Sequence, residues 1–202
     1  MIEINTSNVE AIQTLVSDEM IDGYSTLEVI KDASIMDVDE PTYARVKNLE
    51  FQNGTIEVKV FSKLLEDAPE YARGFIGVVF HVDKNNRTFE GIYVRPTNGR
   101  SRVQARRNAT TQYFSYPNYK FNYLRKEALG MYESYVDIGL EEWIQLKIVV
   151  DGECAELYVN EATQPTLIVN DLKLGKNISG AIGLWVDVGT KGYFKDLKVK
   201  KL

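Results

Sequence analysis

The chain has 202 residues, of which 44% are hydrophobic and 11% aromatic, and its formal net charge is −5 at pH 7. These values are typical of a globular protein and exclude a disordered or fibrous chain. At this length we expect one domain, which would bury roughly 70% of the surface that its unfolded chain exposes.

Cysteine and histidine are too few for several kinds of site. The single cysteine, Cys154, and the single histidine, His81, exclude an intrachain disulfide and a zinc site of nitrogen and sulfur ligands. Neither residue lies in a nucleophile motif, and the glycine-rich motifs that bind phosphate or dinucleotides are absent. We therefore expect no metal and no cofactor.

The sequence shows no membrane or secretion signal. No apolar run approaches the roughly 18 to 20 residues that span a bilayer. The first residues, 1–6, lack both the basic and the apolar region of a secretion signal. As written, the sequence predicts a cytoplasmic protein without a membrane partner. A secreted protein whose signal had been trimmed would look the same.

The first predicted element is a short helix over residues 7–17. Ser7 and Glu10 have the spacing of a capping box. Apolar residues recur there at helical intervals, at Val9, Ile12, Leu15 and Val16.

Strands follow for the rest of the chain. Residues 49–52 and 55–61 predict a hairpin around Asn53-Gly54, because Asn-Gly readily adopts the positive φ angles of a two-residue turn. Later strands are expected in pairs at 74–83 with 87–95 and at 143–150 with 153–160, then singly at 167–169, 180–186 and 193–199. The strand at 74–83 is apolar on both faces, which predicts a central position in its sheet.

This spacing of strands predicts an all-β fold, an antiparallel jelly-roll β-sandwich with a short N-terminal helix. Helical patterns between the strands are missing, which disfavours a parallel α/β architecture. Within the expected single domain, 1–202, residues 1–41 form a helix and lead-in strands, and residues 42–202 form the core sandwich with a long loop at 96–135.

Several segments resemble a known superfamily. They are Phe51 with 53–58, 74–80, 91–96, 142–148, 155–160, 180–185 and 193–199. Together they resemble the concanavalin A-like lectin and glucanase superfamily, and within it bacterial glycosyl hydrolase domains of keto-disaccharide hydrolase type. The resemblance covers residues 42–200 and implies the jelly-roll fold. Proteins with such folds bind carbohydrate, cleave glycosides or serve in adhesion, so the fold alone does not select an activity.

Charge is sorted along the chain. The window from Arg95 to Tyr135 contains six of the nine arginines and six of the twelve tyrosines. With two lysines and two glutamates its formal charge is +6, so the remaining residues sum to −11. Such sorting indicates a site for an anionic or hydroxyl-rich ligand.

The resemblance implies that sugars lie across the concave sheet or the loops at its rim. Guanidinium groups offer forked donors to carboxylates, sulfates and vicinal hydroxyls, and tyrosines offer a flat face with a polar tip. Arg95 and Tyr93 share one face of their strand. The candidate ligand-binding residues are Tyr93, Arg95, Asn98, Arg106, Arg107, Asn108, Tyr113, Tyr116, Arg125, Tyr132, Glu133 and Tyr135. Arg100, Arg102 and Gln112 supply further groups of the same types.

Other interpretations of the window stay open. Its tyrosines could pack as a small satellite core while its arginines pair with acidic residues elsewhere. The same residue types are enriched at subunit interfaces, and the oligomeric state is left open. A nucleic-acid partner is disfavoured by the negative net charge and by the lack of a known motif.

Catalysis would need a pair of carboxyl groups. The Glu-x-Asp-x-x-Glu string of the superfamily's β-glucanases is absent. Its nearest approximations, residues 37–40 and 66–70, have the wrong spacing and are expected in turns or exposed loops. Glu133 is the one candidate acid or base, although a surface salt bridge is the favoured explanation for it. Trp143 and Trp185 could stack on sugars, but core packing is favoured.

These observations favour a domain that binds a saccharide, with acidic saccharides among the candidates. A glycoside hydrolase that uses Glu133 is the alternative, and a non-catalytic assembly module is the third.

Overall fold

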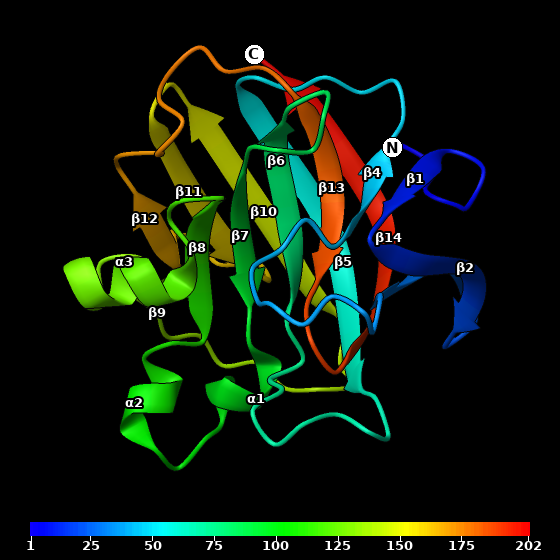
Figure 1. The fold of residues 1–202 in the computed structure, drawn as a ribbon, viewed down its shortest axis with the longest axis horizontal. Helices are drawn as coiled ribbons and strands as arrows, with labels where there is room; N and C mark the ends of the chain where they lie inside the picture. Colours follow the sequence, from blue (N-terminus) through cyan, green and yellow to red (C-terminus); the bar gives the residue numbers. More distant parts are fainter.

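The computed structural model describes residues 1–202. Two antiparallel sheets of seven strands each pack face to face (Figure 1). The first sheet has the order β1 (Val9–Ile12), β4 (Tyr43–Val46), β13 (Ala181–Val186), β6 (Ile76–Val82), β7 (Phe89–Val94), β8 (Thr111–Tyr116) and β9 (Glu133–Ser134). The second has the order β12 (Leu167–Val169), β11 (Cys154–Val159), β10 (Ile144–Asp151), β5 (Gly54–Leu64), β14 (Thr190–Lys201), β3 (Tyr24–Lys31) and β2 (Thr14–Ile21).

The predicted antiparallel β-sandwich is therefore confirmed. The strand pairs β6–β7 and β10–β11 form at the expected residues, the second with its turn at Asp151-Gly152. β6 lies between β13 and β7, and all of its residues are buried, in agreement with the central position predicted from its apolar faces.

Three short helices lie within the window between β7 and β9: α1 (Pro96–Gly99), α2 (Gln104–Arg107) and α3 (Phe121–Glu127). Figure 1 shows them beside the ends of β7 and β8. None of them has the length and apolar content that crossing a bilayer requires.

The predicted N-terminal helix is wrong. Residues 7–17 contribute to β1 and β2, and Gln13 separates the two strands with a φ of +48°. β1 pairs with β4 in the first sheet, and β2 pairs with β3 in the second. Leu15, which a buried helical face would cover, is 66% exposed. Pairing with two sheet edges thus outweighs the helical spacing of a few apolar residues.

The predicted hairpin around Asn53-Gly54 is also wrong. Phe51 forms a bridge with Gly180 at the end of the first sheet, whereas β5 pairs with β10 and β14 in the second. Gly54, with a φ of +132°, lies where the chain passes from one sheet to the other. The turn residues therefore connect two layers instead of two neighbouring strands.

Apolar residues are buried on both faces of the first sheet. Its inner face packs against the second sheet in the main core. Its outer face holds an aromatic layer formed by Tyr43, Phe89, Tyr93, Phe114 and Trp185. Residues 32–42, the blue segment between β3 and β4 in Figure 1, cross in front of the strands of the first sheet.

The two tryptophans have different surroundings. Trp185 is fully buried in the aromatic layer, and its indole Nε1 donates to the Glu40 carbonyl at 2.9 Å. Trp143 is half-buried on the outer side of the second sheet, against Phe61 and Tyr24. The core packing favoured from the sequence is confirmed for Trp185.

Gly91 leaves the space that the Phe114 ring of the aromatic layer occupies. A Cβ built at Gly91 would lie 2.3 Å from Cε1 of Phe114, whose fully buried ring packs against Trp185 at 5.2 Å. We expect Gly91→Ala to lower the free energy of unfolding by about 1–3 kcal/mol, because the ring has no space to move into. Chemical denaturation measures this loss.

Gly139→Ala is the matched control. A Cβ at Gly139 would meet the flexible ends of Arg100, at 2.8 Å, and of Glu142, at 3.4 Å, and we expect a small change there. Equal losses in the two variants would contradict the packing argument.

Candidate functional site

A cavity of about 560 Å³ lies beside the C-terminal end of β7, on the outer side of the first sheet. The wall comes from residues 38–39, from the 71–75 segment before β6, from α1, α2 and α3 and their connections, and from Asp187. Seven of the twelve candidate residues line it: Tyr93, Arg95, Asn98, Arg106, Asn108, Arg125 and Glu133. The window thus contributes most of the cavity wall.

Arg95 is a fixed part of the cavity floor. Its guanidinium lies over the rings of Tyr93 and Phe121, at 5.0 and 5.5 Å from their centroids. Its Nη2 donates to the Tyr93 hydroxyl at 2.9 Å and to Gln112 Oε1 at 3.0 Å. Its Nη1 donates to the Ala109 carbonyl at 3.0 Å. These bonds leave Arg95 little capacity for a ligand and orient the rings around it.

Glu133 is held between two arginines. Its Oε1 accepts from Arg95 Nη1 at 3.3 Å and also from Arg125 Nη2. Its Oε2 accepts from Arg125 Nε at 3.2 Å. The Glu133 side chain is only 7% exposed, so this is a buried ion-pair network instead of the surface pair favoured from the sequence. It also raises the pKa of the Arg125 guanidinium above its ordinary value.

A second buried network also reaches the cavity wall, through Asp39 and Asp187. Lys31 Nζ forms an ion pair with Asp187 Oδ1 at 2.6 Å. Asp187 Oδ2 accepts from the backbone N–H of Asp39 at 2.9 Å, and Asp39 Oδ2 accepts from the backbone N–H of Phe121 at 2.6 Å. The network therefore ties the 32–42 segment to the first sheet and to α3.

Asp39 is buried, although the sequence predicted an exposed loop for residues 37–40. It is 1% exposed. Burial, together with the nearby charge of Asp187, raises the pKa of Asp39 from 3.8 to about 7. The bond from Phe121 N–H and the charge of Arg95 oppose this shift. The Asp39 carboxyl group therefore changes its charge near neutral pH.

Two other guanidinium groups of the cavity lack an acidic partner. Arg73 donates only to the carbonyls of Glu70 and Ala72, at 2.7 and 2.8 Å. Arg106 donates to Asn98 Oδ1 at 3.1 Å and to Thr97 Oγ1 at 3.2 Å. Burial and the nearby Arg106 charge lower the pKa of Arg73. Neutral acceptors thus orient both cations without cancelling their charge, as an anion site requires.

The other five candidate residues lie outside the cavity. Arg107 donates to the Tyr135 hydroxyl at 2.7 Å, on the outer surface of α2. Tyr116 stacks on Phe89. The remaining two bind acidic residues, Tyr113 to Glu90 and Tyr132 to Asp171. Arg100 pairs at the surface with Asp137 and Glu142, and Arg102 is exposed.

Arg73, Asp39 and Phe121 are among the cavity residues that were not predicted from the sequence. Arg73 directly precedes the strand predicted at 74–83, and Phe121 lies inside the basic window among other aromatic residues. Only Asp39 belonged to a group that the sequence had singled out for its carboxylates, and the pattern there pointed to an exposed loop.

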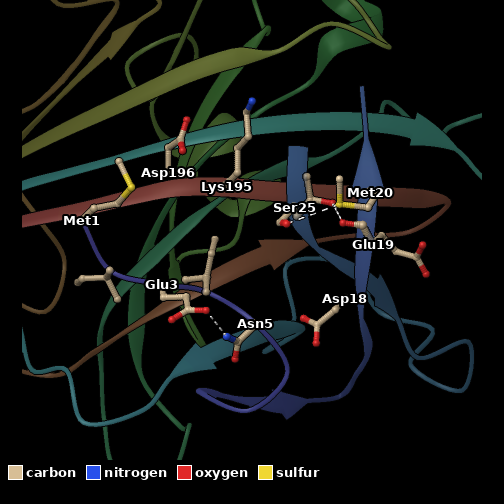
Figure 2. A pocket seen from close by; sticks show the side chains of 12 residues that line it. Met1, Glu3, Asn5, Asp18, Glu19, Met20, Ser25, Lys195 and Asp196 are labelled. Atoms are coloured by element: carbon tan, nitrogen blue, oxygen red, sulfur yellow. Dashed lines mark hydrogen bonds between the residues drawn. The ribbon is translucent and has the colours of Figure 1, made fainter. Parts of the chain in front are cut away.

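A second, larger hollow of about 750 Å³ lies under the N-terminal segment (Figure 2). Its lining includes Glu3, Asp18 and Asp196 but no aromatic residue. Its one cationic side chain, Lys195, has its ammonium 3.0 Å from the centroid of the Tyr24 ring. It offers no ring face and little positive charge, which distinguishes it from the cavity beside β7.

Comparison with known proteins identifies the fold but no family. No family model and no curated protein matches the sequence. Among solved structures, the chain is similar to the carbohydrate binding module CBM66 from Bacillus subtilis, with 14% identity, coverage of 94% of this chain and 93% of that one, and a TM-score of 0.59.

Two further structures share the fold. One is titled a "Putative glycosyl hydrolase" from Parabacteroides distasonis, with 16% identity, coverage of 98% of this chain and 95% of that one, and a TM-score of 0.57. The other is a protein with a galectin-like fold from Bacillus subtilis, with 13% identity, coverage of 94% and 87%, and a TM-score of 0.53. At these identities the likeness shows the β-sandwich.

Proposed function

We propose that this chain binds a saccharide in the cavity beside β7, and that an acidic group of the saccharide binds between Arg73 and Arg106. The observation that carries the proposal is the pair of guanidiniums without acidic partners above an aromatic floor. Tyr71, which is 55% exposed at the cavity wall, adds a ring face on which a sugar can stack.

The solved structures agree with this proposal. One protein of the same fold is by name a carbohydrate binding module, and another is named a "Putative glycosyl hydrolase". As part of the proposal we place the chain in the concanavalin A-like superfamily, which its strand segments resemble, and treat residues 1–202 as one domain.

The test compares the wild type with Arg106→Ala on a glycan array that includes oligouronates and sulfated sugars, followed by calorimetry. We expect Arg106→Ala to weaken binding of the acidic glycan about 10- to 100-fold, the loss of one hydrogen-bonded charge worth about 1.5–3 kcal/mol. Arg102→Ala is the control, because Arg102 carries the same charge on an exposed part of the same window.

Three results would contradict the proposal. They are no glycan signal from folded wild type, equal losses in the Arg102 and Arg106 variants, and a change in sedimentation mass of the Arg106 variant without a change in glycan binding. The last result would instead support the assembly module.

Glycoside cleavage is a second candidate function, favoured by the presence of Asp39 and Glu133 in one cavity wall. A protonated Asp39 could act as the acid opposite a charged Glu133. The bonds that Glu133 accepts from Arg95 and Arg125 favour binding over catalysis. If the wild type released reducing sugar and the Glu133→Gln variant did not, glycoside cleavage would be favoured over binding alone.

A further inference from the structure

Asp39 is the one carboxyl group of the cavity wall without an ion-pair partner. The wall contains three acidic residues, of which Asp187 pairs with Lys31 and Glu133 pairs with Arg95 and Arg125. Asp39 is 1% exposed, accepts the backbone N–H of Phe121 and lies beside the Tyr93 hydroxyl, but it pairs with no lysine or arginine. An ionised Asp39 would therefore place an uncompensated negative charge in the wall of a cavity whose unpaired side chains, Arg73 and Arg106, favour an anion.

Groups from every element around Asp39 contribute to its electrostatics. They are Lys31 at the end of β3, Tyr93 on β7, Arg95 directly after β7, Arg125 on α3, Glu133 on β9 and Asp187 after β13. Lys120 at the start of α3 pairs with Glu40, so that neighbouring pair adds no net charge. The cations near Asp39 are thus already bound to other acceptors, and the neutral form of Asp39 is the one that the site accommodates.

We propose that Asp39 is a specificity-determining residue of this cavity: it stays a neutral carboxylic acid while an acidic sugar is bound, so that capture of the sugar takes up a proton. The inference rests on the proposed function and adds a condition on it: the acidic saccharide binds only while Asp39 is neutral, because a charged Asp39 repels it. A neutral sugar of the same shape would not experience this repulsion.

The direction of the pH dependence follows from the raised pKa of Asp39, about 7. The carboxyl group is mostly neutral at pH 6 and mostly charged at pH 8. If only the neutral form admits the anion, the apparent affinity follows the neutral fraction and falls about tenfold from pH 6 to pH 8. The affinity is thus highest below the pKa and is lost as the pH rises through it.

Two buried groups with shifted pKa values, His81 and Glu90, do not face the cavity. His81, whose pKa burial lowers, bonds to the Gln52 carbonyl beside Phe51. Glu90, whose pKa burial raises, accepts from Tyr113 and from the Leu174 N–H in the interior of the sandwich. Neither group contacts the cavity wall, so their titration does not imitate the effect expected of Asp39.

The experiment measures binding of trigalacturonate by calorimetry at pH 6, 7 and 8, for the wild type, Asp39→Asn and Asp37→Asn. We expect the wild type and the Asp37 variant to bind about tenfold more weakly at pH 8 than at pH 6. The Asp39 variant should bind equally at both pH values, because its amide stays neutral. Asp37 is the matched control, since it is exposed in the same segment. Galactotriose, which has hydroxymethyl groups in place of the carboxylates, should show no such dependence in any of the three proteins.

A second measurement needs no variant. Titration of wild type with trigalacturonate at pH 7, in buffers of different ionisation enthalpy, should show uptake of about half a proton per ligand bound. Binding of trigalacturonate without proton uptake and with equal affinity at pH 6 and 8 would overturn the role of Asp39 and leave the proposed function standing. If folded wild type bound none of the acidic glycans of the array, both the role of Asp39 and the proposed function would be overturned.

Discussion

Asp187→Asn is expected to lower the free energy of unfolding by about 3–5 kcal/mol, because it leaves the Lys31 ammonium buried without a countercharge. The two side chains are 5% and 3% exposed and their charged atoms lie 2.6 Å apart. The same carboxylate accepts the backbone N–H groups of Asp39 and Val188, and an amide cannot accept all three bonds. Denaturation at pH 7 with both proteins at equal concentration gives the difference.

The control for this variant is the same substitution in an exposed ion pair. Asp196 lies 3.1 Å from Lys59, and their side chains are 34% and 42% exposed. We expect Asp196→Asn to cost no more than about 1 kcal/mol. Asn also tolerates the positive φ of position 196, which is +57°. A loss at position 187 no greater than that at position 196 would show that the buried network contributes little to stability.

Trp185→Ala is expected to lower the free energy of unfolding by about 3–5 kcal/mol as well. The indole is fully buried, with the Tyr93 ring 4.7 Å away and the Phe114 ring 5.2 Å away. Its loss leaves a void under the cavity floor and removes the donor that Glu40 accepts in the covering segment. We expect weaker saccharide binding even at temperatures where the variant remains folded, since Tyr93 loses its support.

Trp143→Ala separates the two effects of the Trp185 variant. Trp143 is only half-buried and packs against Phe61 and Tyr24 on the outer side of the second sheet. Its removal should cost less stability and leave saccharide affinity unchanged. A larger loss of stability at Trp143 than at Trp185, or equal losses of affinity, would contradict the supporting role of the aromatic layer.

Strand positions could be predicted where alternation and turn chemistry agree. In β10 and β11 the alternate apolar residues face the core, and Asp151-Gly152 closes the turn. At the N-terminus the same kind of reasoning failed, because a few apolar residues at helical intervals did not reveal that two sheet edges compete for the segment. Around Asn53-Gly54 the turn was recognised, but the pairing of the segments on either side of it was not. Phe51 pairs with Gly180, and β5 pairs with β10 and β14, all of which lie far along the chain.

The cavity could be predicted only where its residues follow a local strand pattern. Tyr93 lies on β7 and Arg95 directly follows that strand, and the strand period of two predicts that both side chains point to the same side, where they line the cavity. The burial of Asp39 depends on Asp187, which lies 148 residues away in sequence. Arg106 lacks an acidic partner because the fold brings no carboxylate close to it. The spacing of residues along the sequence does not predict this.

The N-terminal stretch has a protective role that follows from its two strands. β1 is the outermost strand of the first sheet at the β4 side, and β2 is the outermost strand of the second sheet beside β3. One continuous stretch therefore shields two rows of backbone amides that would otherwise be free to recruit strands from other molecules. Glu10, Asp18 and Glu19 place negative charges on these rims, which discourages aggregation through them.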